Sequence, residues 1–342
     1  MIDTIYIEDE VRNHPKVKAI CGRFPKARLI PCARYGEIFN PKAQNFRLQK
    51  RRPALILAKK FGRFVLQAPR GYGIGGERNF YFSHMLNCMY DCRYCFLQGM
   101  YRSAHFVVFV NFEDFQSAIE GKIKESGGEE SYFFSGYDCD SLALDGLTHF
   151  VDSFLPFFAG RPRAWVELRT KSVQIQALLK HNPIPNCIVA FSMTPPEIGA
   201  RLEEKVPPLS KRLEAMKRLE ERGWKLGLRF DPLMDHEHWK EAYQELFQEV
   251  FRKIRISSLH SVSLGPFRLP KAVYENMYRL YPDEPLLSGP LGEREGMVSY
   301  GRAVEREIVD SVTRELLRYV PKEIFFPCLV NKSDGEPISI SG

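Results

Sequence analysis

Hydrophobic residues along this chain form short runs that alternate with longer amphipathic segments. Six runs rich in Val, Phe, Ile and Tyr have the length and composition of buried β-strands, and they span residues 79–84, 105–111, 131–136, 164–170, 187–193 and 225–232. Helical patterns lie between most of them, at residues 112–124, 147–158, 172–179 and 209–222. In the last of these segments Leu213, Met216 and Leu219 follow helical spacing, with charged residues between them.

Strands and helices that alternate in this way predict βαβ units and a parallel sheet. Six strands fit an incomplete barrel better than a short open sheet. The predicted fold is therefore α/β, a partial (β/α)6 TIM-type barrel with an N-terminal basic extension and a C-terminal α/β appendage. The predicted parts are a basic N-terminal segment packing on the barrel, the barrel itself and a C-terminal substrate-binding region, at residues 1–76, 77–265 and 266–342.

Composition and charge narrow the class of protein. The chain has 342 residues, of which 44% are hydrophobic, so it can bury a sizeable core. It contains no apolar run long enough to cross a bilayer, and its first residues lack the apolar centre of a signal peptide. We therefore expect a cytoplasmic protein with no membrane partner.

The net charge of +7 is unevenly distributed, because residues 1–70 contain 16 Lys and Arg but only 5 Asp and Glu. This asymmetry indicates a polyanionic partner, and the alternative interpretation is an ordinary solvated basic surface.

Three of the eight cysteines, Cys88, Cys92 and Cys95, lie within eight residues of one another. Their CxxxCxxC spacing allows three thiolates on one loop to bind a metal centre. Structural zinc usually takes four ligands in two pairs, and no second pair follows here. Three thiolates on a four-iron cluster leave one iron open to chelate a substrate, as reductive cleavage of a sulfonium requires. A zinc site and three unligated thiols are the alternatives.

Longer stretches carry a more specific signal, at residues 44–50, 91–101, 109–111, 140–145, 191–197, 209–215 and 227–232. Together they resemble the spore photoproduct lyase family, within the radical S-adenosylmethionine superfamily, over roughly residues 15–330. The resemblance implies a partial (β/α)6 barrel, a [4Fe-4S] cluster, S-adenosyl-L-methionine and an external one-electron reductant. It also implies reversal of a thymine dimer, the spore photoproduct, in ultraviolet-damaged DNA through a 5′-deoxyadenosyl radical.

Carried over residue by residue, the resemblance makes Cys88, Cys92 and Cys95 the cluster ligands. It places Lys171 and Ser192 at S-adenosylmethionine, where an ammonium group can pair with the cofactor carboxylate. We also expect Tyr94 and Asp140 at the cofactor site, with Tyr94 as a catalytic residue. The alternative for Lys171 is an ordinary surface lysine after a strand.

The hydrogen donor is the point at which the sequence departs from the family. We expect this role of Cys139, in the loop after residues 131–136. The donor cysteine of the family aligns with Tyr137, however, so that Cys139 is displaced by two positions. Phe96 also stands where the family has a tyrosine proposed to relay the radical. Two alternatives follow: a radical enzyme of this family with another substrate, and a nucleic-acid-binding iron-sulfur protein without radical catalysis.

If DNA is the partner, phosphate contacts must supply much of the affinity. The predicted nucleic-acid-binding residues form one group near the N-terminus and one near the C-terminal region: Arg47, Lys50, Arg51 and Arg52, then Arg268, Lys271, Tyr300 and Arg302. The alternative for each of the basic residues is an ordinary surface charge.

Overall fold

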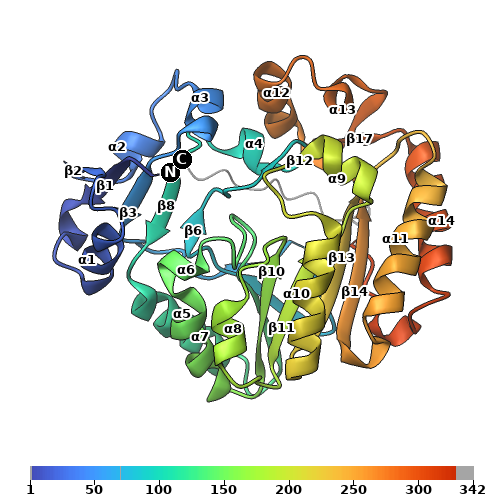
Figure 1. Ribbon diagram of the computed structural model, residues 1–342, viewed down its shortest axis with the longest axis horizontal. Helices are drawn as coiled ribbons and strands as arrows, with labels where there is room; N and C mark the ends of the chain where they lie inside the picture. The colour runs from blue at the N-terminus through green and yellow to red at the C-terminus, as the bar shows by residue number, and fades with distance from the viewer. Residues whose placement is uncertain (1, 70, 329–342) are drawn as a thin grey trace.

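Six parallel strands form the largest sheet, and they follow one another across it in the order of the chain. They are β5 (Arg78–Tyr81), β9 (Ser131–Phe134), β10 (Ala164–Thr170), β11 (Cys187–Ser192), β13 (Lys225–Leu233) and β14 (Leu259–Pro266). The short β4 (Leu66–Gln67) pairs antiparallel with β5. The computed structural model describes residues 2–69 and 71–328, and in it this sheet curls into part of a barrel (Figure 1). The predicted partial barrel is confirmed.

Helices cover the outer face of the barrel (Figure 1). They are α5 (Phe112–Glu125), α7 (Phe150–Ala159), α8 (Gln176–Lys180), α10 (Leu209–Arg222), α11 (Trp239–Lys253) and α14 (Arg302–Leu316). Helix α10 has the bounds that its pattern predicts, because Leu213, Met216 and Leu219 are fully buried on one face. Gly223 ends it with φ near +96°, a conformation that suits glycine. The segment predicted at 147–158 is divided at His149 into α6 (Asp145–Thr148) and α7.

A second sheet, beside the barrel, has the strand order β2–β1–β3–β8–β6. Its strands are β1 (Thr4–Glu8), β2 (Arg28–Cys32), β3 (Leu55–Ala58), β8 (Phe106–Phe109) and β6 (Met85–Leu86). The N-terminal part of the chain also contains η1 (Asp9–Val11), α1 (Pro15–Gly22), α2 (Gly36–Phe39) and α3 (Phe46–Arg51). The basic N-terminal segment is therefore an α/β layer of its own.

One strand that was predicted for the barrel belongs to the second sheet instead. The run at residues 105–111 forms β8, which pairs with β3 in the second sheet and not with the barrel strands. The sixth barrel strand is β14, whose sequence LHSVSLGP mixes Ser, His and Gly with apolar residues. All four residues of β8 are buried, so its composition is that of any strand covered on both faces. Composition predicts a buried strand but does not specify which sheet it joins.

Smaller elements lie across the carboxyl ends of the barrel strands (Figure 1). They include α4 (Leu97–Met100), α9 (Pro196–Leu202) and the antiparallel pair β7 (Asp91–Cys92) and β12 (Glu203–Glu204). The C-terminal part adds η2 (Ile256–Ser258), β15 (Arg268–Pro270), α12 (Lys271–Leu280), α13 (Pro285–Ser288), β16 (Leu291–Arg294), β17 (Met297–Tyr300) and η3 (Lys322–Ile324). Gly99 allows α4 to pack on α12, because a Cβ there would collide with the Val273 carbonyl.

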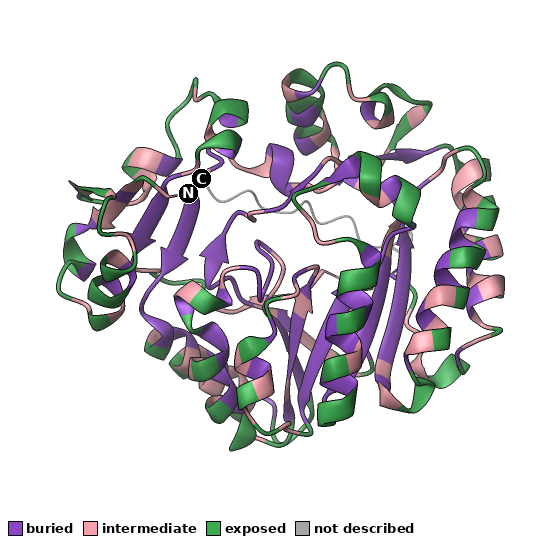
Figure 2. Cartoon of the chain, viewed as in Figure 1, coloured by how far each residue is buried: buried purple, intermediate pink, exposed green. Residues whose placement is uncertain are grey.

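Figure 2 shows that the barrel strands are buried along their length, whereas the helices expose their outer faces. The predicted boundaries at residues 76 and 265 stay predictions, although β8 crosses the first of them by completing the N-terminal sheet. Residues 1, 70 and 329–342 of the predicted segments lie outside the described residues. Among the helices of the described part, none is both long and apolar enough to cross a bilayer.

Candidate active site

The three clustered cysteines lie on a loop at the carboxyl end of β5. Asn87 begins the loop with φ near +68°, a left-handed conformation that asparagine tolerates. Its side-chain amide donates to the carbonyls of Ser103 and His105, at 2.7 and 2.8 Å. Cys92 lies in β7, opposite Glu203 of β12, and the amide of Cys95 donates to the Cys92 carbonyl at 3.1 Å. The backbone therefore holds the loop in a defined shape.

The thiols of this loop fit an iron-sulfur cluster by their chemistry. Cys88, Cys92 and Cys95 are all free. Burial raises the pKa of Cys88 to about 12, and the neighbouring Cys95 adds to that rise. Burial also raises the pKa of Cys92, and both other thiols contribute to that rise. In such a place the thiols stay protonated unless a metal cation replaces the protons.

Within the described residues, His, Cys, Asp and Glu side chains do not converge in threes on a point where one metal ion could bind. The ligands of a four-iron cluster attach to different irons, so their sulfurs lie farther apart than the ligands of a single ion. The spread of the three thiols is therefore compatible with a cluster.

Lys50 lies beneath the cysteine loop. Its Nζ donates to the carbonyls of Cys88 and Tyr90, at 3.1 and 3.0 Å, and the residue is only 6% exposed. The predicted contact of Lys50 with nucleic acid stays a prediction, and in this structure its ammonium group binds the cysteine loop rather than facing the surface. Sequence alone could not separate Lys50 from the exposed bases beside it on α3.

Glu203 is the centre of a buried network that we call the acid–base network: Tyr94, Lys171, Thr194, Glu203 and Arg212. Its carboxylate pairs with Lys171 at 3.1 Å and with Arg212 at 2.9 Å. It also accepts hydrogen bonds from the hydroxyls of Tyr94 and Thr194. Burial opposes ionisation of Glu203, but the charges of Lys171 and Arg212 outweigh it and lower the pKa to about 2. Glu203 thus stays ionised beside the cysteine loop.

Asp140 joins two loops at the carboxyl ends of β9 and β10. Its Oδ1 accepts from the Thr170 hydroxyl at 2.7 Å, and its Oδ2 accepts from the Lys171 amide at 2.7 Å. The predicted cofactor contact of Asp140 stays a prediction, since in this structure both oxygens bind the protein. Ser192, at the end of β11, is 8% exposed, and its carbonyl accepts from Arg212 at 2.7 Å. Lys171 and Ser192 are therefore linked through Glu203 and Arg212.

A second set of side chains, which we call the aromatic cluster, contains Tyr72, Tyr81, Phe96 and Tyr137. Tyr137 is its centre, with ring-centroid distances of 4.4 Å to Tyr81, 5.5 Å to Phe96 and 6.2 Å to Tyr72. Neighbouring parallel strands bring Tyr81 and Tyr137 together, because β5 and β9 end at the same edge of the sheet. Phe96 directly follows Cys95, so the cluster reaches the cysteine loop.

Cys139 faces away from the aromatic cluster. Its thiol is 6% exposed and lies 3.7 Å from the Ser135 carbonyl. It packs with the buried side chains that fill the second sheet, among them Leu57, Met85 and Val108. Burial raises its pKa well above the usual value, and Cys88 contributes to that rise. The residue predicted as hydrogen donor is thus close to the cysteine loop but is covered by core side chains.

Comparison with known proteins decides the family. The family model described as spore photoproduct lyase matches residues 80–303, which include every cysteine of the loop as well as Lys171 and Ser192. This chain belongs to the spore photoproduct lyase family.

Two curated members of the family show the extent of the similarity. The spore photoproduct lyase of a Geobacillus species is 28% identical over 249 residues, which is 70% of this chain and 72% of that protein. The spore photoproduct lyase of Bacillus subtilis is 27% identical over 220 residues, or 63% of each chain. A solved mutant of spore photoproduct lyase, with bound AdoMet and dinucleoside spore photoproduct, superposes with a TM-score of 0.82 at 21% identity. The superposition covers 97% of this chain and 99% of that one.

The first group of predicted DNA contacts in this family member lies on and after α3. Arg47 and Arg51 are exposed and, with Asn45 and Leu48, line a surface pocket of about 400 Å³. Arg47 also lies 5.6 Å from the ring centre of Tyr281, which connects α3 to the C-terminal region. Arg52 is exposed but pairs with Asp3 at 2.8 Å.

The second group is mixed in exposure. Lys271 and Arg302 are exposed, and Lys271 pairs with Glu293 at 2.8 Å. Arg268 is half-buried, and its guanidinium lies 3.2 Å from the Cys328 sulfur. Tyr300 is 5% exposed, and its hydroxyl accepts from the Asp235 amide at 3.0 Å. The predicted contact of Tyr300 with nucleic acid stays a prediction, and in this structure its hydroxyl group binds the loop after β13.

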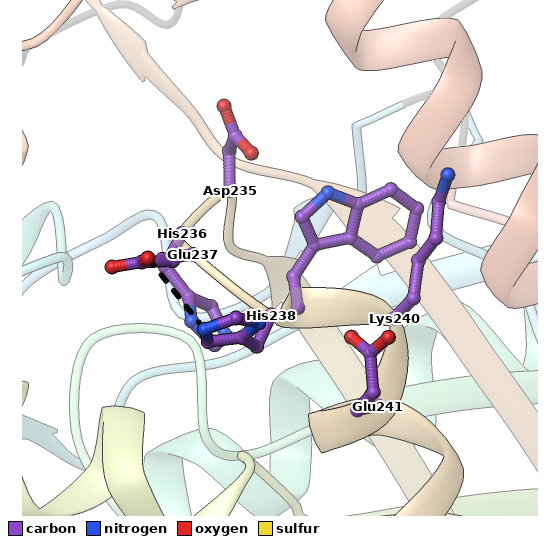
Figure 3. A pocket seen from close by; sticks show the side chains of 7 residues that line it. Asp235, His236, Glu237, His238, Lys240 and Glu241 are labelled. Atoms are coloured by element: carbon purple, nitrogen blue, oxygen red, sulfur yellow. Dashed lines mark ion pairs between the residues drawn. The ribbon is translucent and has the colours of Figure 1, made fainter.

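The loop after β13 forms a surface pocket of about 460 Å³ that was not predicted from the sequence. Residues 235–241 line it, and Figure 3 shows Glu237 beside His238, a pair separated by 3.6 Å. In the same view Asp235 points away from both histidines. His236 pairs with Glu197 of α9 at 3.3 Å. This pocket therefore adjoins the elements that lie across the carboxyl ends of the barrel strands.

Sequence reasoning also missed Thr194, Glu203 and Arg212 of the acid–base network. One signal was present: Arg212 lies three residues after Leu209 and four before Met216, on the apolar face of α10. A charged residue in such a place predicts a buried partner. Glu203 carried no comparable pattern, because it lies in a two-residue strand.

Proposed function

We propose that this chain is a radical S-adenosylmethionine lyase that reverses the spore photoproduct, a thymine dimer, in ultraviolet-damaged DNA. The observation that carries the proposal is the set of three free thiols, Cys88, Cys92 and Cys95, at the carboxyl ends of the barrel strands, of which Cys92 is buried and the other two are half-buried. Membership of the spore photoproduct lyase family supports the same chemistry. A solved relative with bound AdoMet and dinucleoside spore photoproduct supports the cofactor and the lesion.

In this proposal the three cysteines hold a [4Fe-4S] cluster and Lys171 binds the carboxylate of S-adenosylmethionine. When bound and reduced, the cluster supplies the electron that cleaves this cofactor to a 5′-deoxyadenosyl radical. The ammonium of Lys171 pairs with Glu203 at 3.1 Å and lies 5.5 Å from the ring centre of Tyr94. Glu203 therefore sets the position from which Lys171 meets an anionic ligand.

DNA and an external one-electron reductant are the proposed partners. The exposed Arg47 and Arg51 are the best supported contacts with phosphate, since neither has an ion pair within the described residues and both line one pocket. An embedded dimer must leave the base stack in part to reach a site at the barrel mouth. The aromatic cluster offers rings on which such a base could stack.

The hydrogen-donor role of Cys139 and the catalytic role of Tyr94 stay predictions within this proposal. Cys139 must turn out of the core that covers it before its thiol can reach a substrate. Tyr94 is 6% exposed, and its hydroxyl donates to Glu203, so it is already held at the cofactor side.

One assay separates this proposal from its alternatives. The chain is reconstituted with iron and sulfide without oxygen, reduced with dithionite, and incubated with S-adenosylmethionine and dinucleoside spore photoproduct. We expect a four-iron spectrum, 5′-deoxyadenosine and restored thymine. Formation of 5′-deoxyadenosine without thymine points to another substrate, and a four-iron spectrum without 5′-deoxyadenosine points to a non-catalytic iron-sulfur protein. The Cys92→Ser variant serves as the control without an intact ligand set.

A further inference from the structure

Lys50 differs from the other bases of α3 in the direction of its side chain. Arg47 and Arg51 are exposed, whereas Lys50 points inward and is 6% exposed. Its ammonium donates to the Cys88 and Tyr90 carbonyls, and its own carbonyl accepts from Lys205 at 2.9 Å. Helix α3, which belongs to the N-terminal part of the chain, is thus hydrogen-bonded directly to the loop that carries Cys88, the first cysteine of the proposed cluster site.

The charge of Lys50 has no counter-ion among the described residues: no carboxylate lies within ion-pair distance of its ammonium group. Lys171, the other lysine near the cysteine loop, pairs with Glu203 at 3.1 Å. Removing an ammonium from water is costly unless an anion compensates it. Its ammonium group lies 3.1 Å from the carbonyl oxygen of Cys88, so the thiolate that Cys88 forms on binding metal belongs to the residue that Lys50 already contacts.

We propose that Lys50 is a positioning residue of the cluster site, which fixes the turn from Cys88 to Tyr90 and favours the reduced cluster through its charge. This inference rests on the proposed function, in which the three cysteines hold the cluster. Reduction adds one negative charge to the cluster, and a fixed cation in a poorly solvated site stabilises the more negative state. Proteins adjust the reduction potential of an iron-sulfur cluster through the hydrogen bonds and the net charge around its sulfurs.

Two variants separate the charge of Lys50 from its hydrogen bonds. Lys50→Gln keeps an amide donor but loses the charge, and Lys50→Arg keeps both. Each chain is reconstituted without oxygen and titrated with reductant, and the reduced fraction is followed by electron paramagnetic resonance. We expect the ratio of reduced to oxidised cluster at a fixed potential to fall about tenfold in Lys50→Gln, or about 59 mV for a one-electron couple. In Lys50→Arg it stays within about twofold of wild type by the same reasoning.

Lys16→Gln is the control, because Lys16 is half-buried and packs on the Phe112 ring at 3.3 Å, away from the cysteine loop. In Lys16→Gln the ratio of reduced to oxidised cluster at a fixed potential is expected to equal that of wild type. A wild-type ratio in Lys50→Gln overturns the proposal.

The iron content decides the case in which Lys50→Gln binds no cluster. If Lys50→Arg then holds iron at the wild-type level with a near wild-type ratio, the proposal stands; loss of iron from both variants overturns it. Thermal unfolding of the metal-free chains checks that each variant is folded. If the wild-type chain itself gives no four-iron spectrum, the proposed function fails, and that failure is seen before any variant is made.

Discussion

The two sides of the cysteine loop are held by different kinds of contact. On one side the acid–base network is held by charge, and Glu203 forms ion pairs of 3.1 Å with Lys171 and 2.9 Å with Arg212. On the other side the aromatic cluster is held mainly by ring contacts, and among the described residues the Tyr137 hydroxyl has no hydrogen bond to a charged side chain, although that of Tyr72 accepts from Arg169 at 3.1 Å. The first side is fixed by strong directional contacts, whereas the second side is shaped mainly by the packing of rings.

This difference agrees with the way in which the sequence departs from its family. The residues predicted for the cofactor, Lys171 and Ser192, lie on the paired side, where each is linked to the network. The departures, Phe96 and Tyr137, meet each other in the aromatic cluster at 5.5 Å. We infer that the side proposed to bind the cofactor tolerates little change, because its charges depend on one another, whereas ring contacts tolerate a change of ring more easily.

The largest effect is expected from removing the charge at the centre of the paired side. Glu203→Gln leaves Lys171 and Arg212 without their buried partner, so the free energy of unfolding should fall by about 3–5 kcal/mol. Chemical denaturation measures this change, and binding of S-adenosylmethionine should weaken as Lys171 loses its position.

Glu204→Gln is the matched control for that variant. Glu204 is the exposed neighbour of Glu203 and pairs with Arg93 at 2.9 Å, so its loss should cost at most about 1 kcal/mol. Equal losses of stability in the two variants would contradict the claim that the buried ion pairs of Glu203 stabilise the fold more than the exposed pair of Glu204.

The same pairing predicts how stability depends on pH. The pKa of Glu203 in the folded chain is about 2, below the value of 4.5 for an unperturbed glutamate. Because the unfolded chain binds the proton first, the stability from Glu203 is complete above about pH 4.5 and is lost as the pH falls toward 2. Glu167, whose partners Arg229 and Arg169 also lower its pKa to about 2, acts in the same direction. The Glu203→Gln variant should therefore lose less stability over this range, as acid unfolding curves would reveal.

A smaller effect is expected on the aromatic side. Tyr137→Ala removes the central ring, and base–aromatic stacking contributes about 1–3 kcal/mol, so binding of the dinucleoside spore photoproduct should weaken roughly tenfold. Tyr137→Phe keeps the ring and should bind like wild type. The control is Tyr278→Ala, since Tyr278 is 46% exposed and lies on α12 outside the cluster. Unchanged binding by Tyr137→Ala, measured by calorimetry, would mean that the substrate does not stack here.

The smallest effect concerns Cys139. The residue packs in the core of the second sheet and is 6% exposed, so its burial predicts that Cys139→Ala restores thymine as wild type does, an outcome that would contradict the donor role. Product analysis by mass spectrometry checks this outcome. If the variant still forms 5′-deoxyadenosine but loses clean restoration of thymine, the donor role predicted for Cys139 from the sequence is supported, and the loop after β9 must open during the reaction.

Sequence patterns predicted local structure well where burial alone decides it. Helix α10 and strand β10 have the predicted bounds, since each carries a regular apolar pattern that only one kind of element can bury. The same patterns could not assign β8 to its sheet, because a strand covered on both faces looks alike in either sheet. The burial of Lys50 and Tyr300 was not foreseen for a related reason: the exposure of a single polar residue depends on what folds over it.

The sequence by itself determined the chemistry available to this protein: three cysteines at CxxxCxxC spacing, a family pattern around them, and strands and helices in alternation. Spacing suffices for these features because the cysteine ligands lie within one loop and the elements are local. Only the tertiary structure decided that Glu203 and Arg212 anchor Lys171, that Tyr137 meets Phe96, and that Lys50 supports the cysteine loop. These contacts join residues from separate elements, and their charges and rings acquire a role only when folding removes water from between them.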